Sequence, residues 1–342
     1  MNNIFSLAQQ HQFGKIHFKL CQKTGMRAII AIHNTKRGPA VGGCRFIEYH
    51  SDENALIDAL RLAQGMSYKA AMADLPLGGG KSVIIKPKEH FSRQDYMRSF
   101  GEFVESLHGE YITGLDSGTE LSDMDIIAQQ TSFLACKTND HGDPSTYAAE
   151  GVIEGIKAAY AFHFNKTDLT GLTMAIQGLG HVGHGVTVQL QALGVNCIVA
   201  DTNPIATQSL KNVTVVSTQD IHKVECDVFV PCALGGIINP DTIPELKCKI
   251  IAGAANNQLL DNSCAYELHQ KNILFTPDYV INAGGLIFAA GRYLKTPDEE
   301  IQAQIKQIYH RLIDIFQISQ QDNIPPSILV DRIAKEKIGE PV

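Results

Sequence analysis

The chain has 342 residues, of which 44% are hydrophobic and 19% are charged. At about 150 residues per domain, this length predicts two globular domains, and the composition excludes a disordered chain. The formal net charge of -7, without a basic run, argues against a nucleic-acid partner. No apolar stretch approaches the roughly 18 residues of a membrane span, and the first residues lack a signal-peptide pattern. We therefore expect a cytoplasmic protein that binds neither nucleic acid nor membrane.

The cysteines and histidines give no sign of a metal site. The eight cysteines are scattered, and none forms a CxxC pair, so zinc spacing is absent. A chain of this length does not need a disulfide framework, and the sequence predicts reduced thiols that pack as small hydrophobes. The 13 histidines form no HxxxH-type cluster with carboxylates. We expect no bound metal.

The first part of the chain mixes strands and helices. Ala28–Ile32 is a short apolar run typical of a buried strand. Ser51 has the character of an N-cap, and acidic residues follow it in the first turn, where they suit the helix dipole. Apolar residues at helical spacing then predict a helix that ends near Gly65. Ser82–Ile85 is predicted as a strand, and Ser92 as the start of a second helix.

From about Tyr147 short apolar strands alternate with helices. The predicted strands are Thr173–Gln177, Val195–Ala200, Asp227–Val230 and Lys249–Ala252. This alternation is typical of a parallel sheet with both faces covered. A last long helix is predicted from Thr296, because threonine followed three residues later by Glu299 forms a capping box. Its buried stripe is predicted to run from Ile301 to Phe316.

The segment after the strand Thr173–Gln177 carries a glycine pattern. It reads Gly178-Leu179-Gly180-His181-Val182-Gly183, with a helix predicted next and Asp201 closing the following strand. The three glycines allow a tight turn, close approach of a pyrophosphate, and close packing of helix on strand. The helix N-terminus favours phosphate, and Asp201 would accept hydrogen bonds from ribose hydroxyls and repel a 2′-phosphate. The pattern predicts a Rossmann-type doubly wound domain that binds NAD.

A second glycine run, Gly78-Gly79-Gly80-Lys81-Ser82, resembles a phosphate-binding P-loop only in part. A P-loop needs a glycine where Leu75 stands and a helix after the lysine, whereas a strand is predicted here. Phosphoryl transfer is therefore disfavoured. Lys81, at the start of an apolar strand, sits where desolvation lowers the pKa of an ammonium, which would make it a usable general base.

Two further segments add polar groups. Gly42 and Gly43 lie beside an apolar run, where their backbone N–H groups are able to bind a carboxylate. Asp116, in the string TGLDSGT, lies at what is predicted to be the end of a strand.

In combination, these segments resemble the leucine, phenylalanine and valine dehydrogenase group, which is related to glutamate dehydrogenase. The resemblance extends over nearly the whole chain, in GPAVGGCRF, ALRLAQGMSYKAA, LGGGKSVII, TGLDSGT, AIQGLGHVG, VFVPCALGGIIN, AGAANNQL and PDYVINAGGLI. It implies reversible, NAD-dependent oxidative deamination of an apolar L-amino acid to a 2-oxo acid and ammonia. It also implies a homo-oligomer whose two domains flank a cleft.

The resemblance implies roles for individual residues. Lys81 and Asp116 match the catalytic pair, and Lys69 matches the lysine that binds the substrate carboxylate, aided by backbone near Gly42 and Gly43. Asn256 falls near the nicotinamide and Asn257 near the substrate. The substrate side-chain positions are matched by Val41, Gly114, Leu286 and Ala289.

All four side-chain positions are small or apolar, so a charged side chain would be desolvated without a partner, and glutamate is disfavoured. Gly114 and Ala289 leave space for an aromatic ring, and one methylene discriminates by only ~1–3 kcal/mol, which is too little to decide between the two substrate classes. Branched-chain substrates such as leucine are placed slightly ahead of phenylalanine or another aromatic amino acid. Two segments depart from the family pattern, at Gly114-Leu115 and at Phe288–Arg292. The remoter alternative is an NAD-binding protein without catalysis.

The predicted organisation has two domains. Residues 1–140 form the substrate-binding, catalytic and oligomerisation domain, and residues 141–314 form the NAD-binding domain. The C-terminal helix, about 315–342, is expected to pack back on the first domain.

Overall fold

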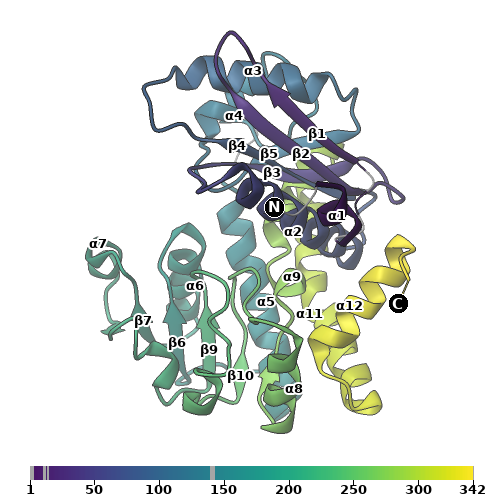
Figure 1. The fold of residues 1–342 in the computed structure, drawn as a ribbon. Coiled ribbons are helices and arrows are strands. Elements are labelled where there is room, and N and C mark those ends of the chain that lie inside the picture. The colour runs from purple at the N-terminus through teal and green to yellow at the C-terminus, as the bar shows by residue number, and fades with distance from the viewer. Residues whose placement is uncertain (1–3, 11–12, 14, 139–142, 342) are drawn as a thin grey trace. The chain divides into compact units, whose positions relative to one another are not determined.

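Figure 1 shows the computed structural model of the chain, which describes residues 4–10, 13, 15–138 and 143–341. The chain divides into two compact units. Unit 1 comprises Met1–Asp143, Ala289–Thr296 and Ala334–Val342, and unit 2 comprises Pro144–Phe288 and Pro297–Ile333. The α/β class predicted from the sequence is confirmed. No helix in the described part of the chain is long and apolar enough to cross a membrane.

Unit 1 is built on a five-stranded mixed sheet in the order β1-β2-β4-β3-β5. Its strands are β1 (Lys15–Leu20), β2 (Arg27–Asn34), β3 (Ala40–Ile47), β4 (Gly78–Ile85) and β5 (Tyr111–Leu115). β1 and β4 run antiparallel to β2, whereas β3 runs parallel to both β4 and β5. The helices of this part are α1 (Ile4–Gln10), α2 (Asp52–Met72), α3 (Arg93–Glu105) and α4 (Leu121–Ile127).

The two faces of this sheet bury different helices, as the period of two along β2 requires. Ile29 and Ala31 pack with the apolar face of α2, together with Val83 of β4. Ile30 and its neighbours of the same parity pack with α3 and α4, around the fully buried Phe100. Figure 1 shows α2 on one side of the sheet and α3 and α4 on the other.

Two sequence-based boundaries in unit 1 are wrong. α2 begins after the N-cap Ser51, as predicted, but it continues past Gly65 to Met72. Glycine costs a helix only about 0.5–1 kcal/mol, and the buried Ser67, Ala70 and Ala71 of the extra turns outweigh that cost. Similarly, β4 begins at Gly78 and not at Ser82, so its glycines are strand residues.

Unit 2 is built on a six-stranded sheet in the order β11-β10-β9-β6-β7-β8. The strands are β6 (Thr173–Gln177), β7 (Asn196–Ala200), β8 (Thr214–Val215), β9 (Val228–Pro231), β10 (Ile250–Ile251) and β11 (Leu274–Phe275). Every pairing is parallel. Numbered from β6, this is the order 3-2-1-4-5-6 of a Rossmann fold, which confirms that prediction.

The first strand, β6, lies between β7 and β9, where the chain order reverses. Ligands of such sheets bind at the carboxyl ends of the strands beside this reversal. The helices from Pro144 on are α5 (Pro144–Phe164), α6 (His181–Ala192), α7 (Pro204–Gln208), α8 (Asn262–Gln270), α9 (Asp278–Ile281), α10 (Gly284–Leu294), α11 (Asp298–Asp322) and α12 (Pro326–Ile338). Short 3-10 helices cover Ile221–Lys223 and Ile243–Glu245.

The last long helix, α11, starts differently from the prediction. Its N-cap is Pro297, without a side-chain cap. Thr296 does not cap it, because the N–H of Thr296 donates to the carbonyl of Gly291 at 2.8 Å and so belongs to the end of α10. The predicted buried stripe from Ile301 to Phe316 is confirmed.

The end of the chain packs on unit 1 through polar contacts. The amide of Asn34 donates to the carbonyl of Ile338 at 3.2 Å, and the ammonium of Lys36 donates to the carbonyl of Gly339 at 2.6 Å. Glu340 lies 3.2 Å from the buried ring of His33. In the structure this return begins at Ala334, whereas Pro297–Ile333 group with unit 2.

Candidate active site

The register of the sheet in unit 1 places Lys81 and Asp116 on one face. Cys44 is opposite Ser82 of β4 and Leu115 of β5, so the positions before and after it alternate to the other face. That face carries Lys81 and, directly after β5, Asp116. It is the face on which α2 packs, because it also carries Val83.

Lys81 and Asp116 form a buried ion pair. The ammonium of Lys81 donates to Oδ2 of Asp116, and the two side chains are only 5% and 16% exposed. Burial by itself raises the pKa of Asp116, but the charges of Lys81 and Arg45 outweigh it and hold that pKa well below its usual range. The carboxylate is therefore anionic over the working pH range.

Glycines make room for this pair. A Cβ at Gly43 would lie 2.8 Å from the Cβ of Asp116, and one at Gly42 would lie 1.8 Å from the carbonyl oxygen of Gly80. Both glycines belong to the central strand β3, and the carbonyl of Gly42 accepts a hydrogen bond from Tyr111 at 2.6 Å. They let neighbouring backbones and the Asp116 side chain approach. Their predicted contact with a substrate carboxylate stays a prediction.

Lys69 lies in the last turn of α2 and is half-buried. This turn packs against the glycines of β4, since a Cβ at Gly79 would lie 2.0 Å from the backbone nitrogen of Ser67. Ser67, two residues before Lys69, therefore lies against Gly79, which is two residues before Lys81. The extra turns of α2 and the glycine strand carry Lys69 and Lys81 on adjoining elements.

The predicted side-chain positions differ in their surroundings. Val41 is buried on β3, and Gly114 lies opposite Gly43 on β5. A Cβ at Gly114 would meet only Ala135, at 3.6 Å and beyond, which is an ordinary van der Waals contact, so a methyl group fits here without a clash. Leu286 and Ala289 are half-buried, three residues apart on α10.

The departure from the family pattern at Phe288 has a packing explanation. Phe288 is fully buried, and its ring stacks on that of Tyr147 with centroids 4.0 Å apart and planes 9° from parallel. Such stacking contributes about 0.5–1.5 kcal/mol beyond the burial of area. The Phe288 side chain thus fills the interior beside α5.

The glycine pattern of unit 2 has three distinct environments. Gly178 has a φ of +92°, which favours glycine, and a Cβ at Gly183 would lie 2.0 Å from the carbonyl oxygen of Gly178. Gly180 is exposed, caps α6, and would have nothing within 4 Å of a Cβ. The open side of the turn is therefore at Gly180. Leu179 is buried, whereas His181 is exposed and Val182 half-buried in the first turn of α6.

Asp201 is fixed at the end of β7 beside this turn. Its Oδ2 accepts a hydrogen bond from the N–H of Leu179 at 2.6 Å, and its Oδ1 accepts one from Asn203 at 2.7 Å. A tight turn, an open glycine, a helix N-terminus and a half-buried carboxylate together fit a dinucleotide.

The segment with Asn256 and Asn257 lies against the loop after β9. The carbonyl of Asn257 accepts a hydrogen bond from Gly236 at 2.8 Å, and both asparagines are exposed. The amide nitrogen of Asn282 donates to the side-chain oxygen of Asn256 at 2.9 Å and to the carbonyl of Ala254 at 3.0 Å. Asn282 is 7% exposed, and its Oδ1 has no hydrogen-bond partner.

Sequence reasoning assigned no role to Asn282 or to Arg45. The signal for Asn282 was available, because it is a polar residue in the apolar string PDYVINAGGLI and polar groups inside such strings are bonded when buried. Arg45 followed Gly42 and Gly43 in a quoted motif, but no spacing rule connects it to Asp116.

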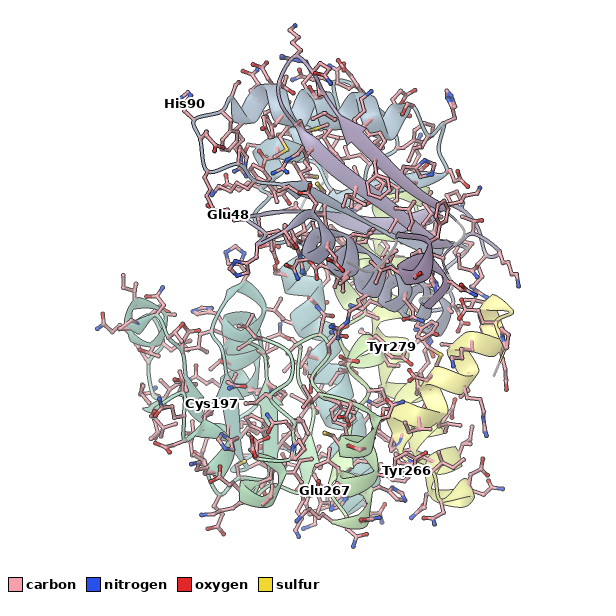
Figure 2. The ribbon with its side chains drawn as sticks, in the orientation of Figure 1. Glu48, His90, Cys197, Tyr266, Glu267 and Tyr279 are labelled. Atoms are coloured by element: carbon pink, nitrogen blue, oxygen red, sulfur yellow. The ribbon has the colours of Figure 1, made fainter. Side chains whose placement is uncertain are left out.

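Among the remaining polar groups, the thiol of Cys21 is acidified, because hydrogen bonds with Thr24 and Ser99 lower its pKa to about 7. The described residues include no group of three or more histidine, cysteine or acidic side chains able to hold a metal. All eight cysteines are free, and burial raises the pKa of Cys197 on β7, labelled in Figure 2, to about 11. Such a thiol stays protonated at neutral pH and is inert.

Comparison with known proteins identifies the family. The model of the Glu/Leu/Phe/Val dehydrogenase dimerisation domain matches residues 10–133, and that of Glutamate/Leucine/Phenylalanine/Valine dehydrogenase matches residues 198–325. The chain belongs to this family. The prediction of an amino-acid dehydrogenase with a nicotinamide cofactor is thereby confirmed.

Individual relatives cover nearly the whole chain. Leucine dehydrogenase of Geobacillus stearothermophilus is 42% identical over 98% of this chain and 93% of its own length. Phenylalanine dehydrogenase of Lysinibacillus sphaericus is 44% identical over 88% of this chain and 82% of its own. The crystal structure of L-tryptophan dehydrogenase from Nostoc punctiforme has a TM-score of 0.83 at 39% identity, covering 98% of both chains.

Proposed function

We propose that the protein catalyses the reversible, NAD-dependent oxidative deamination of a branched-chain L-amino acid such as leucine. Amino acid, NAD⁺ and water give the 2-oxo acid, ammonium, NADH and a proton. The buried pair of Lys81 and Asp116 is the observation that carries this proposal. A lysine and a carboxylate in contact, on a face where glycines allow close approach, form a proton-transfer site within an amino-acid dehydrogenase family.

The residues of unit 1 have separate tasks in this proposal. Lys69 binds the substrate carboxylate and fixes the substrate orientation, and positioning of this kind contributes ~7–11 kcal/mol. Lys81 takes the proton from the water that adds to the α-carbon and returns it to the departing amine. Asp116 stabilises the positive charge on nitrogen and passes protons with Lys81. A bound nicotinamide would supply the acceptor for the hydride of the α-carbon.

NAD is proposed over NADP on the strength of Asp201. Its two oxygens are held by the N–H groups of Leu179 and Asn203, so the carboxylate stays at the glycine turn. A 2′-phosphate there would meet a fixed negative charge, whereas ribose hydroxyls would donate to it. Gly178, Gly180 and Gly183, with the start of α6, would hold the pyrophosphate.

A branched-chain substrate is favoured because Val41 is apolar and the leucine dehydrogenases match over 98% of this chain. The space at Gly114 supports the aromatic alternative, which the phenylalanine and tryptophan dehydrogenase relatives represent.

One panel experiment tests these assignments. The protein is mixed with L-leucine, L-valine, L-isoleucine, L-phenylalanine, L-tryptophan or L-glutamate and with NAD or NADP, and NADH formation is followed by absorbance. We expect the highest kcat/KM with a branched-chain amino acid and NAD. A preference for phenylalanine would move the substrate to the aromatic alternative, and no turnover with any amino acid would contradict the catalytic proposal.

We also propose a homo-oligomer that forms through unit 1 and resides in the cytoplasm. β1 is an edge strand that exposes 52% of Phe18 and 57% of Leu20, and such an edge can pair with a second copy. The eight free cysteines agree with a reducing compartment. Phe18→Lys should reduce the mass measured by analytical ultracentrifugation if this edge forms the contact.

A further inference from the structure

Arg45 has a place in the site that the proposed roles of Lys81 and Asp116 do not explain. We propose that Arg45 is a positioning residue for the reaction: it holds one oxygen of Asp116 so that the other remains directed at Lys81. This inference rests on the function proposed above for that pair.

The Asp116 carboxylate is divided between two sets of donors. Its Oδ1 accepts from Nε of Arg45 at 3.2 Å and from the backbone N–H of Ser117 at 2.6 Å. Its Oδ2 accepts from Lys81. Because Oδ1 is held from two directions, the carboxylate plane is fixed, and Oδ2 is the oxygen left for proton traffic.

Arg45 is itself held in place. Its Nη1 donates to Oδ2 of Asp58 on α2 at 2.9 Å, and the same oxygen accepts from the hydroxyl of Tyr49 at 2.6 Å. Burial and then the hydrogen bond to Asp58 raise the pKa of Tyr49, so its hydroxyl keeps its proton and remains a donor. Arg45 is 21% exposed and bridges two carboxylates, a geometry that suits the fork of a guanidinium.

The charges explain what this bridge does. Two cations, Lys81 and Arg45, pair with two anions, Asp116 and Asp58. The thiol of Cys44 adds no charge, because burial raises its pKa to about 12. Arginine keeps its proton at all working pH values, so lysine is the one of these two cations that takes part in proton transfer. When Lys81 is neutral, Arg45 still balances the charge of Asp116.

Removing Arg45 has a defined consequence. The negative charge of Asp116 then acts on Lys81 without a competing cation, and the carboxylate loses one of the two donors that hold its Oδ1. Oδ2 is no longer kept directed at Lys81, so proton transfer by the pair should slow while binding of NAD is unaffected.

The test is steady-state kinetics of Arg45→Gln at saturating NAD, with the best amino acid of the panel. We expect kcat to fall by about 10- to 100-fold and the KM for NAD to stay unchanged. Arg45→Lys should recover part of kcat, because a point charge reaches only one of the two carboxylates.

Arg27→Gln is the matched control. It removes the same charge from unit 1, from a side chain that is 49% exposed and paired with Asp52. Its kcat should match the parent. If Arg45→Gln does not fold, Asp58→Asn takes its place, since it leaves the bond to Asp116 and loosens the anchor of Arg45; a fall in kcat of smaller size is then expected.

The outcomes separate this inference from the proposed function. An unchanged kcat in Arg45→Gln, or a loss of rate matched by a loss of thermal stability, would reduce Arg45 to a structural role and overturn the inference. If Lys81→Ala kept normal turnover, the proposed function itself would fail. If Lys81→Ala were inactive while Arg45→Gln behaved as the parent, only the role of Arg45 would be lost.

Discussion

The polar sites of the two units are built from different chemical groups. In unit 1 the chemistry-bearing groups are buried charges, where Lys81 and Asp116 neutralise each other and Arg45 completes the set. In unit 2 the site is mainly backbone and neutral amides, arranged around Gly178–Gly183 and Asn282. Proton transfer needs groups that ionise, whereas holding a phosphate needs free N–H groups and empty space. Mutations should therefore damage chemistry in unit 1 and binding in unit 2.

The largest effect is expected from Lys81→Ala. The variant keeps Arg45 beside Asp116, so the carboxylate is not left as an unpaired buried charge and unit 1 should fold. Loss of the proton acceptor should lower kcat by at least about 10³-fold with little change in NAD affinity. Stopped-flow kinetics and calorimetric titration measure the two quantities. Lys88→Ala, at an exposed position after β4, is the control, and near-normal kcat in Lys81→Ala would refute the base assignment.

The next effect is on cofactor binding and comes from Gly180→Ala. A Cβ at Gly180 has nothing within 4 Å, and its φ of -63° suits any residue, so the fold should not change. The methyl group would occupy the open side where a pyrophosphate approaches, and the Kd for NAD should rise by about 10- to 100-fold.

Gly183→Ala provides the contrast to Gly180→Ala. Its Cβ would lie 2.0 Å from the carbonyl oxygen of Gly178, so this variant should lose thermal stability in addition to affinity. Equal Kd values for NAD in Gly180→Ala and the parent would remove Gly180 from the binding site.

A smaller effect is expected from Asp201→Ser. Serine removes the charge that would repel a 2′-phosphate, so the ratio of kcat/KM for NAD to that for NADP should fall by about tenfold. The hydrogen bonds from Leu179 and Asn203 are weakened too, and some loss of affinity for NAD is expected. An unchanged ratio would show that another feature selects the coenzyme.

The smallest effect concerns stability and the end of the chain. Burial lowers the pKa of His33 from its ordinary value of 6.5 to about 4. The unfolded chain therefore binds this proton first as the pH falls, and stability is lost between pH 6.5 and 4, by roughly 3 kcal/mol at most. The raised pKa of Glu340, also caused by burial, offsets part of that loss.

His33→Gln should flatten the dependence of Tm on pH in this window, measured by circular dichroism between pH 7 and 4. The parent should lose more Tm than the variant across the same range. Identical slopes would show that His33 is accessible to protons in the folded protein.

The sequence was most informative where one motif carried its own geometry. The strand, glycine turn, helix and Asp201 predicted the cofactor end of unit 2, because short-range spacing alone sets that arrangement. Lys81 and Asp116 were found individually, but their contact depends on the parallel register of β3 with both neighbours, which no local pattern specifies.

The misses have the same cause. α2 passes Gly65, and β4 includes Gly78, because tertiary packing between the two outweighs the propensity of glycine to end an element. Arg45 reaches Asp116 across 71 residues of sequence, and Glu340 reaches His33 from the far end of the chain. Such partners become visible only once strand order is known.

The return of Ala334–Val342 to unit 1 has a consequence for synthesis on the ribosome. His33 and Lys36 are made early, yet their contacts with Glu340 and Gly339 cannot form until residues 339 and 340 have left the ribosome. These contacts of unit 1 therefore form only after the residues of unit 2 have been synthesised. A product truncated before Ala334 would lack both contacts.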